Sequence, residues 1–299
     1  MRTIPPRESR EPLSAPPEPR SRHLVFVSAG DRSNIHHWLR GRRDFDLWIV
    51  YYGNEAGKFL DVADFRVSRK GSKFQNLHYC YGLWADTLQR YESIMVMDDD
   101  IVIDATALTH LFEMRRERDL WLLQPAFRLR GKISWDITRV RPTAQLRYTN
   151  YVEMACPLFR RDKLDAFMEV YDPELVGYGA DWWFLHCLGE LEGRVAVVDA
   201  WPCINPFDKA KGGAREIDQL QSHEERKRVW ERMKVLHGLD EQGRHHIEFG
   251  RVARSAPGAA LAVASYVSDW TYVETRKLAR RMIHGLGAQR DAEHPGGPA

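Results

Sequence analysis

The sequence has few cysteines and no long apolar run. Cys80, Cys156, Cys187 and Cys203 are far apart and form no CxxC pair, which argues against a zinc site or a disulfide framework and favours free thiols in a reducing compartment. Without a run of about 18 apolar residues, no membrane-spanning helix is expected. Residues 1–21 lack the apolar stretch of a signal peptide and are rich in Pro, Arg, Glu and Ser, so we predict a disordered tail and a cytoplasmic location.

An excess of charge of one sign is also absent. The formal net charge is +2, with 44 Lys and Arg against 42 Asp and Glu, so no overall field favours nucleic acid as a partner. The 299 residues, 43% of them hydrophobic, are enough for one large domain with a sizeable core. We place this domain at residues 22–250, followed by a helix at 255–288 and a disordered tail at 289–299.

Short apolar runs alternate with segments of helical periodicity. This alternation predicts an α/β fold with a mainly parallel central sheet, in which ligands bind beyond the carboxyl ends of the strands. Strands are predicted at 23–30, 45–53, 64–69, 93–97, 120–127, 151–159 and 194–200, helices at 73–91, 105–119, 161–171, 180–191 and 216–237, and a loop at 139–150.

The stretch IMVMDDDIVI, residues 94–103, runs apolar residues directly into three carboxylates. Side chains two apart on a strand face the same side, so Asp98 and Asp100 are expected to point together and Asp99 to point away. Two converging carboxylates suit a hard divalent cation, Mn²⁺ or Mg²⁺, that also binds substrate phosphates. A solvated acidic turn is the alternative, and it fits less well because apolar residues flank the cluster closely.

Two functions that use a metal compete for this motif. An aspartate-dependent phosphatase would use Asp98 as its nucleophile, but its motif follows the first strand of the domain and needs a later G-D-x-x-x-D motif, which is missing here. In a nucleotide-sugar glycosyltransferase, a D-x-D motif lies in mid-domain and its metal bridges the aspartates to a diphosphate. The position of DDD after three strand-like runs favours the glycosyltransferase.

Two further carboxylates are candidates for catalysis. Sugar transfer with inversion needs a general base near the acceptor hydroxyl, and Asp181 lies in GYGADWWF, between a Gly-rich loop and Trp182 and Trp183. A simple helix cap is the alternative for Asp181. Glu153 lies within an apolar run, where a carboxylate requires an explanation. We interpret Glu153 as facing the site, with a structural salt bridge as the alternative.

The donor is expected to bind at the carboxyl ends of the first and fourth strands. Residues 28–30 end the first strand and are placed to receive the nucleotide, and two polar residues open the helix that precedes the aspartates. A solvated basic loop at 69–73 is the alternative for the helix start. The predicted donor-binding set is Ser28, Ala29, Gly30, Lys73, Asn76, Asp98 and Asp99. Residues 207–213, FDKAKGG, are predicted to form a mobile loop whose lysines could close over a diphosphate.

Six segments, in order, resemble the family called domain of unknown function 707. YESIMVMDDDI is similar to its Y-D-Y-I-F-L-W-D-E-D-L, and GYGADWWF to its G-W-G-L-D-F. The other four are FDLWIVYYG, LLQPAF, YVEMACPLFRR and VAVVDAWPCIN. The resemblance covers roughly residues 24–213. Because this family is usually thought to look like GT-A glycosyltransferases, the resemblance implies a GT-A-like, Rossmann-type α/β sandwich.

Carried over residue by residue, the resemblance makes Asp98 and Asp100 the D-x-D motif, Glu153 a site carboxylate and Asp181 the base. The sequence departs from the family at one metal ligand. The family places a His after its V-V-D, whereas Asn205 stands near that position here. The carbonyl oxygen of Asn205 is the third predicted metal ligand, and a weaker one.

The C-terminal segment 259–286 combines apolar residues at helical spacing with a basic cluster. Its basic residues are Arg276, Lys277, Arg280 and Arg281. A basic amphipathic helix with Trp and Tyr can lie on an anionic membrane surface, so peripheral contact with the inner face of the membrane is predicted. Packing of this helix on its own domain is the alternative.

The predicted function is metal-dependent transfer of a sugar from a nucleotide-diphosphate sugar to a glycan or lipid-linked acceptor, as in polysaccharide biosynthesis. If the transfer inverts the anomeric centre, Asp181 is the expected general base; retention, which would remove this role, is the alternative. The alternative from another class is a nucleotide- or carbohydrate-binding protein of the same fold without catalysis, suggested by the missing His. An aspartate-dependent phosphatase is the remaining alternative.

Overall fold

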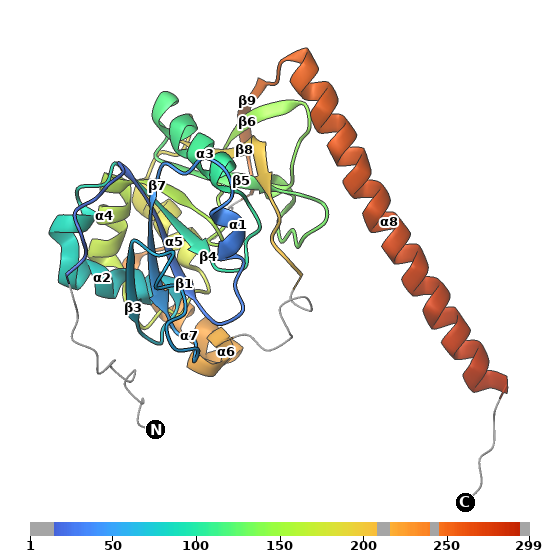
Figure 1. The fold of residues 1–299 in the computed structure, drawn as a ribbon, viewed down its shortest axis with the longest axis horizontal. Helices are drawn as coiled ribbons and strands as arrows, with labels where there is room; N and C mark the ends of the chain where they lie inside the picture. Colours follow the sequence, from blue (N-terminus) through green and yellow to red (C-terminus); the bar gives the residue numbers. More distant parts are fainter. Residues whose placement is uncertain (1–14, 208–215, 240–244, 294–299) are drawn as a thin grey trace, which may run out of the picture.

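A computed structural model describes residues 15–207, 216–239 and 245–293 (Figure 1). Most of the predicted N-terminal tail, the end of the C-terminal tail and nearly all of the predicted loop at 207–213 lie outside these residues. The described residues form a sheet covered by helices, from which one long C-terminal helix projects.

One nine-stranded sheet runs through the domain in the order β3-β2-β1-β4-β7-β5-β8-β6-β9. Strands β3, β2, β1 and β4 are parallel, as are β5 and β8, whereas β7, β6 and β9 run antiparallel to their neighbours. The predicted α/β class is confirmed. The strands are β1 (His23–Ala29), β2 (Asp46–Tyr51), β3 (Phe65–Ser68), β4 (Ser93–Asp98), β5 (Leu122–Phe127), β6 (Ala144–Thr149), β7 (Leu158–Arg160), β8 (Val195–Cys203) and β9 (Glu248–Ala253).

Helices cover both faces of the sheet, so its central strands are apolar on both sides. Leu24 and Phe26 of β1 pack toward α2, α4, α5 and α7, whereas Val25 and Val27 pack toward α1 and α3. Burial on both faces explains why these strands are continuous apolar runs without alternation. The helices are α1 (Ile35–Trp38), α2 (Lys73–Leu88), α3 (Ala105–Glu117), η1 (Asp136–Thr138), α4 (Arg161–Val170), α5 (Ala180–Leu188), α6 (Glu216–Leu220), α7 (His223–His237) and α8 (Ala256–Glu293).

Three sequence predictions of secondary structure were wrong in part. Residues 139–150 contain β6 rather than only loop, because their backbone pairs with β8 and β9. Residues 151–159 form a regular strand only at β7. The single helix predicted at 216–237 is divided into α6 and α7, because Ser222 and Glu225 form a capping box that starts α7.

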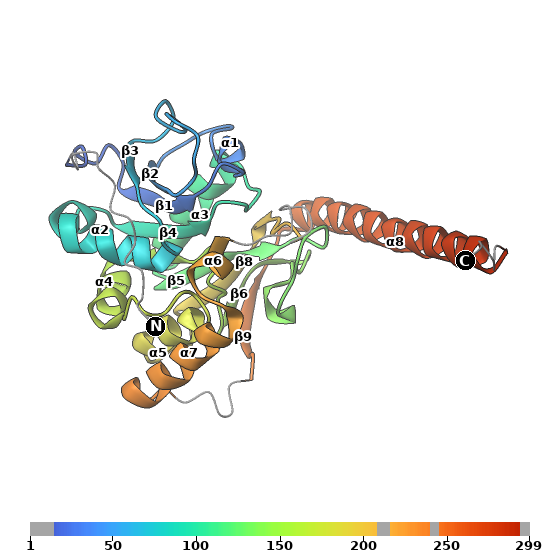
Figure 2. The same cartoon turned by 90° about the horizontal axis from the view of Figure 1, so that it is seen from below.

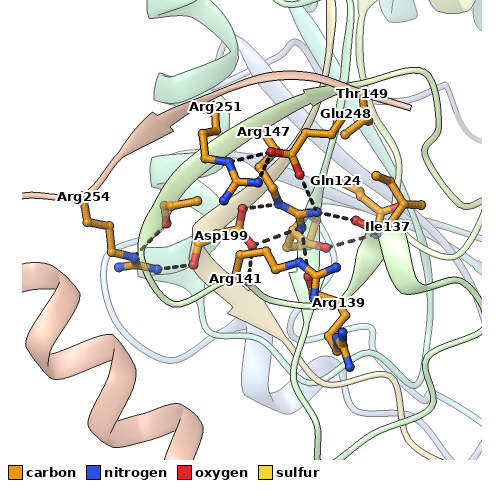
Figure 3. A network of polar contacts seen from close by, with 12 residues as sticks. Gln124, Ile137, Arg139, Arg141, Arg147, Thr149, Asp199, Glu248, Arg251 and Arg254 are labelled. Carbon is orange, nitrogen blue, oxygen red and sulfur yellow. Dashed lines mark hydrogen bonds and ion pairs between the residues drawn. The ribbon is translucent and has the colours of Figure 1, made fainter. Parts of the chain in front are cut away.

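A buried ion pair joins β6 to β8 (Figure 3). Arg147 donates from Nε to Asp199 Oδ2 at 2.9 Å and from Nη2 to Oδ1 at 3.1 Å, and both side chains are 0% exposed. The same guanidinium donates to the carbonyl oxygens of Ile137 and Arg139, and Arg141 N donates to Asp199. This geometry satisfies both buried charges and fixes the loop that follows η1.

Helix α8 extends away from the sheet instead of lying along it (Figures 1 and 2). Its attachment is Asp269, 2% exposed, which binds the guanidinium groups of Arg128 and Arg130. Among the residues that the structure describes, no helix is long and apolar enough to cross a membrane. Several apolar side chains of α8 are nevertheless exposed: Leu261, Val267, Trp270, Tyr272 and Leu278.

We predict that Asp199→Ala lowers the free energy of unfolding by about 3–5 kcal/mol, because it leaves the buried Arg147 without its bidentate partner. Urea denaturation measures this loss. Asp136→Ala is the control, since Asp136 pairs with Arg139 and Arg141 while its own side chain is 64% exposed. The control loss should stay within about 1 kcal/mol. Similar losses in the two variants would contradict the prediction.

Candidate active site

The carboxyl ends of β1 and β4 lie side by side at one rim of the sheet, where Ser28 is the register partner of Asp98. Helix α2 begins at the same rim. Asn76 Nδ2 donates to Ser28 Oγ at 2.8 Å, and the Arg69 guanidinium donates to Asn76 Oδ1. A side chain at Gly71 would place its Cβ 2.5 Å from Asn76 Oδ1, so this turn requires glycine. The predicted donor residues of β1 and α2 are therefore in contact.

Lys73 is the positive group that meets the carboxylates. Its side chain is 6% exposed, and Nζ lies 2.8 Å from Asp98 Oδ1. The ammonium also donates to the carbonyl oxygens of Met154 and Ala155. Three acceptors match the three N–H donors of an ammonium, which compensates its burial. Lys73 thereby ties α2, β4 and the segment 153–155 together.

Asp99 turns toward the end of β1. Gly30 N donates to Asp99 Oδ2 at 2.9 Å, and Tyr52 OH donates to the same oxygen at 3.3 Å. Burial raises the pKa of Asp99 to about 7; the N–H of Gly30 opposes this shift, and the charges of Asp100 and Asp98 add to it. Strand β4 ends at Asp98, so Asp99 and Asp100 lie beyond it. The alternating side-chain orientation of a strand therefore applies to Asp98 but not to the two carboxylates that follow.

Asn205 lies beside the aspartates. An antiparallel bridge joins Val102 to Ile204. Because the two segments run in opposite directions, Asn205, which follows Ile204, lies on the same side of the bridge as Asp100, which precedes Val102. Asn205 is 7% exposed, and its main-chain oxygen accepts from Lys132 N, so its side-chain carbonyl oxygen is not used in this contact. The oxygen donors of Asp98, Asp100 and Asn205 thus come from neighbouring segments, which suits a hard cation.

The oxygen atoms of Asp98, Asp100 and Asn205 are suitable ligands for Mn²⁺ or Mg²⁺, with one restriction. A cation bound to Asp98 would share this carboxylate with the ammonium of Lys73, which weakens its binding by charge repulsion. In the described part of the chain, no group of three His, Cys, Asp or Glu side chains could hold a metal. The metal-binding role of Asp98, Asp100 and Asn205 therefore stays a prediction.

Asp181 lies in the first turn of α5 and accepts a hydrogen bond of 2.7 Å from Tyr151 OH. The preceding Gly179 has a positive φ of 88° and lies so close to Trp230 that a Cβ would approach its ring to 2.2 Å. Only glycine fits this position, which sets the start of α5. Trp183 is 1% exposed and belongs to the core, so only Trp182 remains near the predicted base.

Aromatic side chains surround the Tyr151–Asp181 contact. The ring of Tyr151 lies 5.0 Å from Trp182 and 4.4 Å from His246, and His246 lies 4.8 Å from Trp135. We call Trp135, Tyr151, Trp182 and His246 the aromatic cluster. Trp135 is 44% exposed, so the cluster offers an accessible ring face.

Glu153 lies between Tyr151, which contacts Asp181, and the carbonyl groups of Met154 and Ala155, which bind Lys73. Its side chain is 6% exposed and accepts from Thr138 Oγ1 at 3.0 Å, and its N–H donates to Gln124 Oε1 at 2.6 Å. Burial raises the pKa of Glu153 to about 7; Thr138 opposes the shift, and the charges of Asp181 and Asp98 are among the others that act on it. Within the described residues Glu153 forms no ion pair, so the salt-bridge explanation of this carboxylate was wrong.

Sequence reasoning missed the aromatic cluster except for Trp182, and it also missed Tyr52 and Gln124. Trp135 and His246 lie in segments without regular periodicity, and Tyr151 was interpreted as a strand residue. The only signal was the presence of aromatic residues within polar segments. Their proximity depends on η1, β6 and α5 meeting at one rim, which the chain order does not reveal.

No protein-family model and no curated protein matches the chain, so membership of the family named above is not shown. The chain is similar to solved structures of S. aureus TarS (TM-score 0.46, 11% identity, 74% of this chain and 46% of that chain) and of TarS 1-349 (0.47, 13%, 74% and 75%). Another is GalNAc-T7 with UDP, GalNAc and Mn²⁺ (0.42, 11%, 62% and 43%). These are GT-A-like glycosyltransferases, and the likeness concerns the fold alone; the chain spans less than half the length of the first and the last.

We predict that Glu153→Gln stabilises the protein at pH 8 and has little effect near pH 4. The folded-state pKa of about 7 lies above the ordinary value of 4.5, so ionisation destabilises the fold increasingly as the pH rises between these values. The full effect is about 3 kcal/mol. Thermal unfolding of both variants across this pH range measures it, with the exposed Glu169→Gln as control. A pH-independent difference would contradict the assignment.

Proposed function

We propose that the protein transfers a sugar from a nucleotide-diphosphate sugar to a glycan or lipid-linked acceptor. The donor binds where β1, β4 and α2 meet, and the acceptor binds at the aromatic cluster. The observation that supports this most is that the segment 151–155 contacts both sides. Tyr151 OH donates to Asp181 on the acceptor side, while the carbonyl oxygens of Met154 and Ala155 accept from Lys73 on the donor side. A transferase must hold its two substrates next to each other, and this segment brings the two groups of residues together.

The donor side combines positive and hydrogen-bonding groups suited to a diphosphate and a ribose. Lys73 supplies a fixed ammonium, while Ser28, Ala29 and Gly30 form the end of β1 beside it. Asn76 fixes the hydroxyl of Ser28. A bound Mn²⁺ or Mg²⁺, held by Asp98, Asp100 and Asn205, would neutralise charge on the departing diphosphate.

On the acceptor side, Asp181 is the proposed general base. Its carboxylate takes the proton of the acceptor hydroxyl while the hydroxyl oxygen forms a bond to the anomeric carbon of the donor. The bond from that carbon to the diphosphate oxygen breaks, and the nucleoside diphosphate leaves with the electron pair. Tyr151 OH orients the carboxylate at 2.7 Å, and the exposed ring of Trp135 offers a surface on which a sugar can stack.

A second candidate function is binding without catalysis. The ion pair between Lys73 and Asp98 favours it, because this pair already neutralises the carboxylate that a catalytic cation would use. Donor binding that is independent of Mn²⁺ and Mg²⁺, without hydrolysis or transfer, would identify such a protein. The phosphatase alternative requires hydrolysis of simple phosphate esters instead.

We also propose that α8 lies on an anionic membrane surface, which would bring the rim close to a lipid-linked acceptor. The helix projects from the domain and exposes Leu261, Val267, Trp270 and Leu278. Arg276 and Lys277, with the further arginines that follow in sequence, provide the positive charge that attracts anionic headgroups.

We predict that Asp181→Asn leaves donor binding intact and lowers turnover about 10²- to 10⁴-fold, the usual cost of losing a general base. Asp100→Ala should instead weaken metal-dependent donor binding. Calorimetric titration of UDP-sugars with Mn²⁺ measures binding, and product formation measures turnover.

Full turnover by Asp181→Asn would show that Asp181 is only a helix cap. A product that retains the anomeric configuration of the donor would likewise contradict its role as base. Tyr151→Phe is the companion variant: it removes only the orienting hydroxyl and should lower turnover less than Asp181→Asn does.

We predict that the full chain sediments with vesicles containing anionic lipid but not with vesicles of neutral lipid alone. Trp270→Glu should abolish this binding, because it places a charge on the apolar face of α8. Val235→Glu is the matched control, since Val235 is an 86% exposed apolar residue on α7. Failure to sediment, or self-association through α8 in its place, would refute membrane contact.

A further inference from the structure

A polar cavity lies at the rim of the sheet opposite the candidate active site, near the amino ends of β1 and β4. Its volume is about 360 Å³. Four arginines and two carboxylates contribute to its lining, which leaves an excess of two positive charges: Arg90, Arg115, Arg160 and Arg161, with Glu92 and Asp162. None of these residues belongs to the candidate active site.

Most of these charges are already compensated by ion pairs. Arg160 binds Asp162 through two hydrogen bonds of 2.6 and 2.8 Å and also contacts Asp119. The remaining pairs are Arg161 with Asp165, Arg90 with Glu18 and Arg22 with Glu92. The lining carboxylates are thus engaged by other cations, and neither forms an ion pair with Arg115.

Arg115 is the exception. It comes from the last turn of α3 and is 5% exposed, and its Nε is buried without a hydrogen-bond partner. Across the described residues, its guanidinium forms neither a hydrogen bond nor an ion pair. Arginine cannot deprotonate to escape this situation, and a buried charge without a partner costs several kcal/mol. The charges of Glu92 and Asp119 offset part of this cost, but no acceptor among the described residues bonds to the guanidinium, which is therefore available to an anion in the cavity.

Near the amino ends of β1 and β4, two further buried polar atoms have no hydrogen-bond partner among the described residues. They are Ser93 Oγ and His23 Nδ1. Ser93 is the register partner of His23 on one side and of Arg160 on the other, so the three side chains lie next to one another along the amino rim. The ring of His23 stacks on Phe112, one turn before Arg115 on α3. Arg115, Ser93 and His23 therefore lie at the same corner of the sheet, and of these three only Arg115 lines the cavity.

We propose that this cavity binds a phosphate group, with Arg115 as its main ligand. The planar guanidinium matches the geometry of a phosphate through two parallel hydrogen bonds. The volume accommodates inorganic phosphate or the phosphate of a small organic monoester. The site is separate from donor binding, since it lies at the other ends of the strands.

The test is thermal unfolding of the full chain titrated with inorganic phosphate, and separately with glycerol phosphate, at constant ionic strength. A ligand that binds the folded state raises the melting temperature in a saturable way. Arg115→Met should lower the affinity for phosphate about 10- to 100-fold, the effect of losing a charged hydrogen-bond pair. Arg116→Met is the matched control, because Arg116 is the exposed neighbour on α3, and it should respond as the wild type does.

A second readout separates ligand binding from a structural role. Without phosphate, Arg115→Met should be as stable as the wild type or more stable, because it removes a buried charge that has no partner. A large loss of stability in this variant would show that Arg115 supports the fold, and would overturn the proposal. Equal phosphate responses in Arg115→Met and Arg116→Met would do the same, since they would place the phosphate elsewhere, for example beside Lys73. A response to glycerol phosphate alone would identify an organic monoester as the ligand.

Discussion

The buried ammonium of Lys73 bonds to one carboxylate and two carbonyl oxygens, and these three acceptors come from different parts of the chain. Asp98 ends β4, while Met154 and Ala155 belong to the segment that carries Glu153. A chain can run a strand of the core into consecutive carboxylates only if a positive charge meets them at the rim. Lys73 is that charge, and the shape of the rim follows from where α2 places it.

Buried charges in this protein fall into two kinds. Arg147 and Asp199 neutralise each other in full, and their pair joins strands. Glu153 and Arg115 are nearly as buried but form no ion pair among the described residues. Since an unpaired buried charge destabilises a fold, its presence calls for an explanation outside the fold, such as a substrate or another ligand. Both proposed sites rest on this contrast.

The local sequence pattern was sufficient to predict an element where hydrophobic burial alone determined it. The apolar runs of β1, β2 and β4 are buried on both faces, so hydrophobicity alone predicted them, and α3 followed from its periodicity. The local pattern failed at β6. Its central Arg147 is charged yet fully buried, because Asp199, 52 residues away, compensates the charge. Hydrophobic periodicity cannot recognise a strand whose inward residue is an ion-paired arginine.

The sequence by itself determined the α/β class, the position of the carboxylates at a strand end and the helix that starts with Lys73, because these depend on burial and spacing within short segments. Only the tertiary structure decided which charges meet. It brought Lys73 to Asp98 and Tyr151 to Asp181, and among the described residues it left the guanidinium of Arg115 without a hydrogen-bond partner. Such pairings depend on strand order and helix placement, since an ion pair or hydrogen bond acts only over a few ångströms of space, whatever the distance along the chain.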